Sequence, residues 1–277
     1  MDRLVVDSLL HPTDFSETDS GAVAHALKIA LAARAKLTFL HVGQKGADVD
    51  WADFPQIRTL LSSWGVVGPE ASKEDVLSTG MQVRKSLRKG EDVVAEIVGE
   101  AGAGDADLIV LATHQRQGIA RWLNKPLAET IAREARKPTL FVPRQIEGFV
   151  RRETGHLHFD NVLIPISKHP RPKHAVEVAT GLAGLLGARN VTFSLLFVGP
   201  EDRRPSVETP EVEGWTFRSL SRDGEVVAAI LDESEEVGAD LIVMATDGRE
   251  GFLDALRGTT TEQVLRGAKC PLLAVPA

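Results

Sequence analysis

The residues best suited to chemistry lie between positions 245 and 262, where glycines and threonines follow a continuous apolar run. Gly248 lets the backbone approach a ligand closely or adopt a positive φ. Gly258 is followed by three threonines, Thr259–Thr261, at the expected start of a helix. A helix start offers free amide protons and the positive end of the helix dipole, so this segment suits a phosphate group. The same spacing equally suits a capping box, in which Thr259 caps the helix and Glu262 completes the box.

An internal repeat supplies a comparison for this segment. The sequences that end at Pro143 and Pro276, 133 residues apart, align without a gap back to Leu87 and Leu220. At the positions of the two glycines and the first threonine, the earlier copy has Gln115, Lys125 and Pro126. Proline is acceptable at the start of a helix but donates no amide proton. We therefore expect the first copy to keep the fold and to lose the phosphate site.

After the first strand of each copy, it is the first copy and not the second that has the acidic residue. Asp14 follows this strand in the first copy, where its carboxylate suits hydrogen bonds from a base or a sugar, or the capping of the next helix. The second copy has Ser167 at this place. Pro12 and Pro165 mark the two first strands and are 153 residues apart, whereas the later parts of the two copies are 133 residues apart. The first copy therefore carries 20 additional residues, the difference between these two spacings, between its first strand and Leu87. Aligning residues 41–43 with 197–199 places these additional residues after the second strand.

A scaffold of alternating strands and helices must position these loops. In the first copy we expect strands at 5–10, 37–42, 83–87 and 108–112 and helices at 17–35, 57–64 and 91–101, with Ser16 as the first N-cap. In the second copy we expect strands at 162–164, 191–198, 215–220 and 241–245, a helix at 224–237 and a loop at 201–214. This alternation predicts an α/β fold with a doubly wound parallel sheet in each copy. The apolar runs at 108–112 and 241–245 are typical of central strands.

Length and composition limit the classes of function. The 277 residues suit two domains, which we place at 1–145 and 158–277, with a linker at 144–159. The net charge of −7 argues against a nucleic-acid partner, because binding to a phosphate backbone relies on clustered lysines and arginines. No apolar run suits a signal peptide or a bilayer span, so we expect no membrane partner and a cytoplasmic location. The single cysteine, Cys270, excludes an intramolecular disulfide and is interpreted as a small buried apolar residue.

Across nearly its whole length the chain resembles the universal stress protein family in its tandem two-domain form. The family pattern is G-x2-G-x9-G-[ST] after the fourth strand, together with an aspartate after the first strand. The second copy matches three of the four positions, as Ala245-x2-Gly248-x9-Gly258-Thr259. The first copy matches none of them, as Ala112-x2-Gln115-x9-Lys125-Pro126, but its Asp14 matches the family aspartate.

The resemblance implies an adenine nucleotide α-hydrolase-like fold for both copies, which pair through their last strands, 139–142 and 272–275, as a pseudo-dimer within the chain. We also expect two chains to associate as a homodimer. Some members of the family bind ATP or AMP, and others bind no nucleotide. Carried over to the second copy, the nucleotide site consists of Pro165, Ile166, Ser167, Val198, Met244, Ala245, Asp247, Gly248, Arg249, Gly258, Thr259 and Thr260.

Two functions are open at this point. The first is a stress-response protein that binds ATP or AMP in its second copy, with Mg²⁺ only as the companion of ATP, and acts through its conformation or partner contacts. The alternative is an interaction or assembly module that binds no nucleotide. Ser167 and Ala245 favour this alternative, because they replace the family aspartate and glycine. No phosphate-binding P-loop, nucleophile elbow or paired-histidine zinc motif occurs, so we assign no catalytic residue and no metal ligand and expect at most slow ATP hydrolysis.

Overall fold

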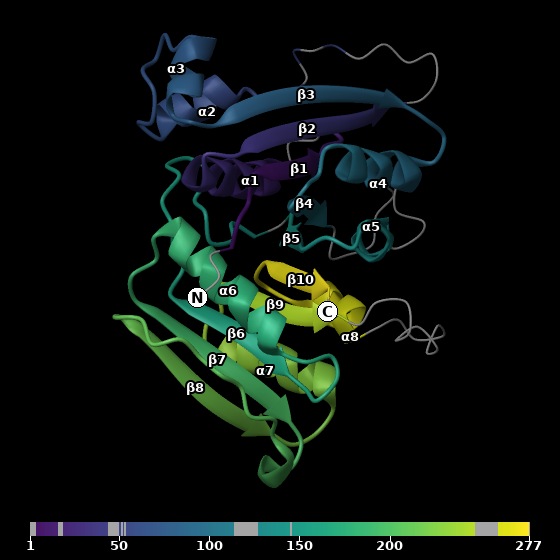
Figure 1. Cartoon of the computed structure of the whole chain (residues 1–277), viewed down its shortest axis with the longest axis vertical. Coiled ribbons are helices and arrows are strands. Elements are labelled where there is room, and N and C mark those ends of the chain that lie inside the picture. Colours follow the sequence, from purple (N-terminus) through teal and green to yellow (C-terminus); the bar gives the residue numbers. More distant parts are fainter. Residues whose placement is uncertain are drawn as a thin grey trace.

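The computed structural model describes residues 4–15, 19–43, 50, 52, 54–113, 127–144, 146–246 and 260–276. These residues form one sheet of ten strands with helices on both faces (Figure 1). The first half comprises β1 (Ser8–Pro12), α1 (Ser20–Ala33), β2 (Lys36–Gly43), α2 (Ile57–Ser63), α3 (Lys73–Ser78), β3 (Gln82–Lys89), α4 (Val93–Ala103), β4 (Leu108–Thr113), α5 (Leu127–Ala135) and β5 (Thr139–Pro143). The second half comprises β6 (Asn161–Ile166), α6 (Lys173–Leu186), β7 (Val191–Val198), a 3-10 turn (Glu201–Arg203), β8 (Trp215–Arg222), α7 (Val226–Glu236), β9 (Leu241–Thr246), α8 (Thr260–Gly267) and β10 (Leu272–Pro276).

Within each half the strands run parallel, and the two halves meet through their last strands. The strand order is β3-β2-β1-β4-β5-β10-β9-β6-β7-β8. β5 and β10 are antiparallel neighbours, with Phe141 opposite Leu272 and Leu140 opposite Leu273. Figure 1 shows the first half above this seam and the second half below it. The predicted α/β fold and the pairing of residues 139–142 with 272–275 are therefore confirmed.

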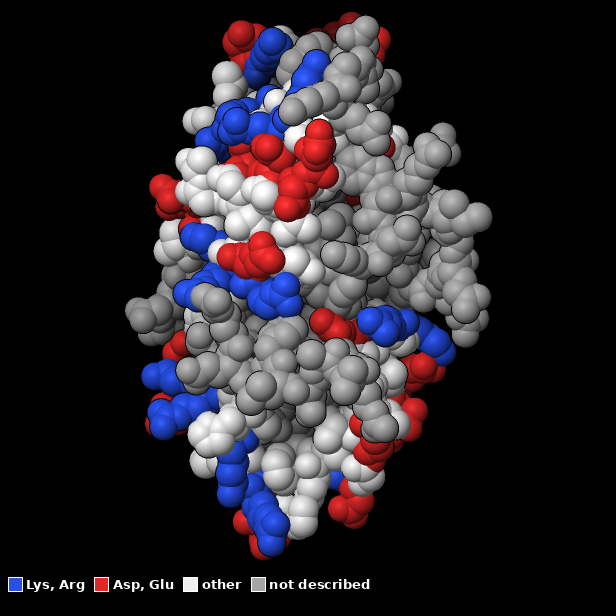
Figure 2. Space-filling view, turned by 90° about the vertical axis from the view of Figure 1, so that its right-hand side faces the viewer, with Lys and Arg blue, Asp and Glu red and all other residues white. Residues whose placement is uncertain are grey.

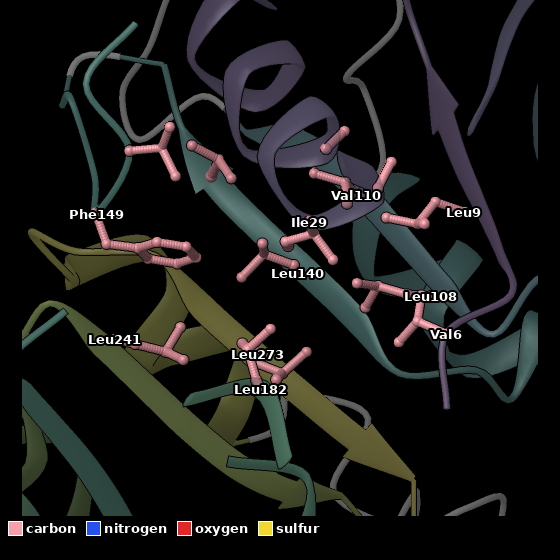
Figure 3. Packing of buried hydrophobic residues seen from close by; sticks show 14 of the residues in the cluster. Val6, Leu9, Ile29, Leu108, Val110, Leu140, Phe149, Leu182, Leu241 and Leu273 are labelled. Atoms are coloured by element: carbon pink, nitrogen blue, oxygen red, sulfur yellow. The ribbon is translucent and has the colours of Figure 1, made fainter. Parts of the chain in front are cut away.

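The helices cover the sheet in two layers. One layer holds α1, α2, α3 and α6, and its apolar core runs without interruption from one half to the other. The opposite layer holds α4, α5, α7 and α8. Figure 3 shows Ile29 and Leu140 of the first half near Leu182 and Leu273 of the second, with the ring of Phe149 at one end of the group. Because each Å² of buried apolar surface contributes about 25 cal/mol, this shared core stabilises the contact between the halves.

An aspartate present in both copies holds the start of each first strand. Asp107 Oδ2 accepts hydrogen bonds from the backbone amides of residues 7 and 8, at 2.8 and 3.0 Å. Asp240 Oδ2 accepts them from the amides of residues 160 and 161, at 2.8 and 2.9 Å. Each copy therefore uses the residue just before its central strand to position the neighbouring strand.

The connection between the halves packs against α1 and α2. Phe149 and Val150 are buried, and their backbone amides donate to Nε2 of His25 at 3.1 and 3.3 Å. Nδ1 of His25 donates to the carbonyl of residue 21 at 2.8 Å. The indole N–H of Trp64, which follows α2, donates to the carbonyl of Arg152 at 2.7 Å. Since α2 belongs to the residues that only the first copy has, this insertion helps to hold the linker.

Several local expectations differ from the structure. α1 begins at Ser20 with Asp19 as its N-cap residue, so the prediction that Ser16, itself outside the described residues, caps this helix is wrong. Asp19 makes no side-chain capping bond, since its backbone is helical (φ −81°, ψ −11°) rather than extended, and its Oδ2 lies 3.2 Å from Nε2 of His11. β1 begins at Ser8, later than the predicted residue 5, and α3 was not predicted.

Cys270 is buried and free, and burial raises the pKa of its thiol to about 12. The interpretation of this residue as part of the apolar core is confirmed. Within the described residues, no helix is both long and apolar enough to cross a membrane. The described histidine, cysteine, aspartate and glutamate side chains form no group of three or more that could hold a metal ion.

Candidate functional site

Each half has a switch point, where the chain leaves two neighbouring parallel strands toward opposite sides of the sheet. At the first switch point β1 lies between β2 and β4, and at the second β6 lies between β7 and β9. In sheets of this kind, ligands bind beyond the carboxyl ends of the strands at such points. The residues that end these strands are therefore the candidate site residues.

The second switch point brings together the described part of the predicted nucleotide site. The ends of β6, β7 and β9 supply Pro165, Ile166, Ser167, Val198, Met244 and Ala245. Ile166 and Met244 are buried and support the sheet, whereas the other four residues are half-buried. Half-buried side chains at strand ends leave surface that a ligand can contact.

The glycine-containing part of the predicted site lies outside the described residues, namely Asp247, Gly248, Arg249, Gly258 and Thr259. α8 begins at Thr260, which is exposed, so a helix starts where the sequence predicted one. Its first turn carries Glu262. The choice between a phosphate site and a capping box at Thr259 stays a prediction.

Ser167 and Asp14 occupy equivalent places, and each is engaged by its own half. The hydroxyl of Ser167 donates to the carbonyl of His169 at 2.9 Å, within the loop that follows β6. The carboxylate of Asp14 pairs with Arg144 Nη2 at 2.6 Å. Because α1 begins only at Ser20, the alternative role of Asp14 as a helix cap is wrong.

At the first switch point, an aromatic side chain covers the end of β2. The ring of Phe15 stacks on His41, with centroids 4.0 Å apart and planes 18° apart. The same ring meets Phe54 edge-on, at 4.8 Å and 67°. Nδ1 of His41 donates to the carbonyl of Thr13 at 2.9 Å, which fixes the plane of the imidazole. This cluster was not predicted from the sequence, because its members come from three separate segments.

The second switch point has the same aromatic position without the covering ring. Phe197 lies opposite Ile166 in the sheet and corresponds to His41 in the alignment of 41–43 with 197–199. Lys168 stands where the first copy has Phe15. Among the described residues, no aromatic ring stacks on Phe197, which is half-buried. Phe197 was not among the predicted site residues, although the alignment that identifies Val198 also identifies the residue before it.

A buried charged pair lies beside the first switch point. Nδ1 of His11 donates to the carbonyl of Val110 at 2.9 Å, and Nε2 lies 3.2 Å from Asp19 Oδ2. Burial alone would lower the pKa of His11, but the charge and the hydrogen bond of Asp19 outweigh it and raise this pKa. The second copy has Ile164 and Pro172 at the two positions, so the pair is particular to the first half. It joins β1 to the start of α1.

A model of the universal stress protein family matches residues 6–143 and 216–276, well over half of the chain. The chain belongs to this family. A universal stress protein A homolog of Coxiella burnetii is 38% identical over 103 residues, which cover 37% of this chain and 70% of the relative. A universal stress protein of Synechocystis sp. is 22% identical over 139 residues, which cover 44% of this chain and 88% of the relative.

Solved structures of similar proteins share the fold over both halves. A universal stress protein from Archaeoglobus fulgidus has a TM-score of 0.62 and 18% identity, and the match covers 98% of each chain. A putative universal stress protein from Pseudomonas aeruginosa has a TM-score of 0.63 and 15% identity, with 99% of this chain and 94% of the other covered. At these identities the likeness concerns the fold, which is that of a tandem universal stress protein.

This universal stress protein carries opposite charges at its two switch points. The loop after β1 contains the acids Asp14 and Asp19, whereas the loop after β6 contains Lys168 and Arg171, both exposed. Figure 2 shows blue and red side chains interspersed on the described part of one face. Asp14 and Asp19 are paired with Arg144 and His11, whereas Lys168 and Arg171 are exposed, so an anion is favoured at the second switch point.

Proposed function

We propose that this universal stress protein binds one adenine nucleotide, ATP or AMP, at its second switch point and none at its first. Binding acts through the conformation of the second half or through contacts with a partner, and not through rapid turnover. The proposal rests on a difference between two equivalent aromatic side chains, one of which is covered by another ring and one of which is covered by no ring of the described residues. Phe15 covers His41 in the first half, whereas no described ring covers Phe197 in the second.

The proposed place for the adenine and ribose is at the ends of β6 and β7. These ends offer half-buried apolar side chains, Pro165, Phe197 and Val198, which suit a planar base. Ser167 gives its hydroxyl proton to the carbonyl of His169, but its oxygen keeps lone pairs that accept a hydrogen bond. A serine in place of the family aspartate supplies a weaker acceptor, because hydrogen bonds to a charged group are the stronger ones.

The proposed place for the phosphates lies between the end of β9 and the start of α8. Ala245, Gly248, Gly258 and Thr259 precede the first helical residue, Thr260. The start of α8 favours negative charge through its free amides and dipole. Lys168 and Arg171 add positive charge from the loop after β6. Mg²⁺ enters the proposal only with ATP, through the phosphate oxygens.

The alternative function is an interaction or assembly module that binds no nucleotide. One observation favours it, namely that the hydroxyl of Ser167 is already engaged by its own loop. Under this alternative, the core shared by the two halves serves to present a fixed surface to a partner. A cytoplasmic location and a homodimer belong to both proposals.

Isothermal titration calorimetry with ATP and AMP separates the two functions. We expect one site per chain, lost in Gly258→Val, because a branched side chain blocks the approach of the phosphates to the backbone. Lys125→Val is the matched control, since residue 125 is the equivalent position of the first half, and it should leave binding unchanged. No binding by folded wild-type protein up to millimolar nucleotide, or equal losses in both variants, would contradict the proposal.

A further inference from the structure

We infer that the first half contains an aromatic slot, formed by His41 and Phe54, in which the chain's own Phe15 takes the place of a ligand ring. The slot lies at the end of β2, where the fold places ligand sites. Once Phe15 is removed, it binds a planar, uncharged heteroaromatic ring. This inference concerns the first half and goes beyond the nucleotide proposed for the second.

The two walls of the slot are held independently of Phe15. The imidazole of His41 is fixed by its hydrogen bond to the carbonyl of Thr13, at 2.9 Å. Phe54 is 1% exposed and belongs to the apolar core, and the ammonium group of Lys85 lies 5.3 Å from its ring centroid. Walls that are fixed before a ligand arrives lose little conformational freedom on binding. The slot therefore keeps its shape when its occupant is removed.

The burial, backbone conformation and stacking of Phe15 are those expected of a ring that fills a ligand position. Phe15 is half-buried as a residue, so its position is open to solvent. Its backbone φ is 63°, in the left-handed region that is unfavourable for a bulky L-residue. Its stack on His41, at 4.0 Å and 18°, is the geometry that a planar ligand would also adopt. A residue held in a strained conformation by its ring contacts indicates that those contacts outweigh the strain.

The charges around the slot decide the class of ring. Asp14, which precedes Phe15, is paired with Arg144 at 2.6 Å, and Asp19 of the same loop is buried and paired with His11 at 3.2 Å. The ammonium group of Lys85 lies 5.3 Å from the centroid of the Phe54 ring. Because both acids are paired and both walls of the slot are aromatic, the slot favours an uncharged aromatic ring. Indole is a suitable probe.

The test uses the full chain in a Phe197→Leu background, so that the aromatic side chain proposed to receive a base in the second half cannot contribute. Phe15→Ala should bind indole saturably in calorimetry, and its thermal midpoint should rise with indole concentration. The parent with Phe15 should show neither effect. In Phe15→Ala/His41→Leu, which keeps an apolar wall but removes its planar ring, indole affinity should fall about tenfold.

Two controls keep the inference open to refutation. Phe15→Gly also removes the ring and suits the positive φ, so it replaces Phe15→Ala if that variant does not fold. Cyclohexanol, a saturated ring, should bind at least about tenfold more weakly than indole, because it cannot stack. The inference is overturned if folded Phe15→Ala and Phe15→Gly bind no indole, or if cyclohexanol binds as well as indole. Failure here leaves the nucleotide proposal standing, since that proposal concerns the other half.

Discussion

Acidification should release the linker from α1, because it protonates His25. Nε2 of this fully buried histidine accepts the backbone amides of Phe149 and Val150, and Nδ1 donates to the carbonyl of Gly21. A second proton on the ring would fall on Nε2 and turn the acceptor into a donor that faces two other donors. Protonation and linker docking therefore exclude one another.

The size and sign of the loss of stability on acidification follow from the pKa of His25. Burial, partly offset by the hydrogen bond to Gly21, lowers the pKa of His25 from 6.5 to about 4. Between these values the unfolded chain binds the proton more readily, so the stability that neutral His25 contributes is complete above pH 6.5 and is lost as pH falls. The loss reaches about 2 kcal/mol at about pH 5 and about 3 kcal/mol below about pH 4, at 1.36 kcal/mol per pKa unit.

The assay compares urea unfolding of the wild type and His25→Gln at about pH 7.5, 6 and 5. The comparison is necessary because His11, whose pKa is raised, acts in the opposite sense: its contribution is present below pH 6.5 and is lost as pH rises through its folded pKa. Subtracting the free energy of unfolding of His25→Gln from that of the wild type removes the contribution of His11, which both proteins share. We expect the wild-type advantage to shrink by about 2 kcal/mol between about pH 7.5 and 5. If the difference in the free energy of unfolding between the wild type and His25→Gln does not change with pH, the reasoning is refuted.

Three further predictions follow from the contacts. Gly148→Ala should lower the free energy of unfolding by about 1–3 kcal/mol in urea titrations, because φ is 73° there and an added Cβ would lie 2.5 Å from His25 Cε1. Asp240→Ala should cost about 2–4 kcal/mol in the same assay, since it leaves two backbone amides without their acceptor. Lys168→Ala/Arg171→Ala should weaken ATP binding more than AMP binding in calorimetry, and the difference should shrink at high salt.

The sequence predicts the sheet well because several of its strands, such as β4 and β9, contain continuous apolar runs of neighbouring residues. The predicted strand 191–198 coincides with β7, and the apolar runs at 108–112 and 241–245 lie within β4 and β9. The repeat shows that both halves share one scaffold before any contact is known. The pairing of β5 with β10 followed from the family resemblance, since nothing local in either strand specifies its partner.

The parts that the sequence did not predict depend on contacts between distant residues. Asp19 contacts His11 of β1, and Asp14 pairs with Arg144, which follows β5. Phe15, His41 and Phe54 show no periodic pattern, so no window of sequence contains their cluster. Of the predicted nucleotide site, the residues at the ends of β6, β7 and β9 lie together at the second switch point, while the role of each stays a prediction.

The central claim is that the nucleotide binds in the second half only. Hydrogen exchange measured by mass spectrometry, with and without ATP, tests it most directly because it reports each half separately. We predict slower exchange in peptides that contain 165–168, 197–199, 244–249 and 258–263, and unchanged exchange in peptides that contain 12–15, 41–43 and 112–115. Equal protection of the two sets, or protection of the first set alone, would contradict the account.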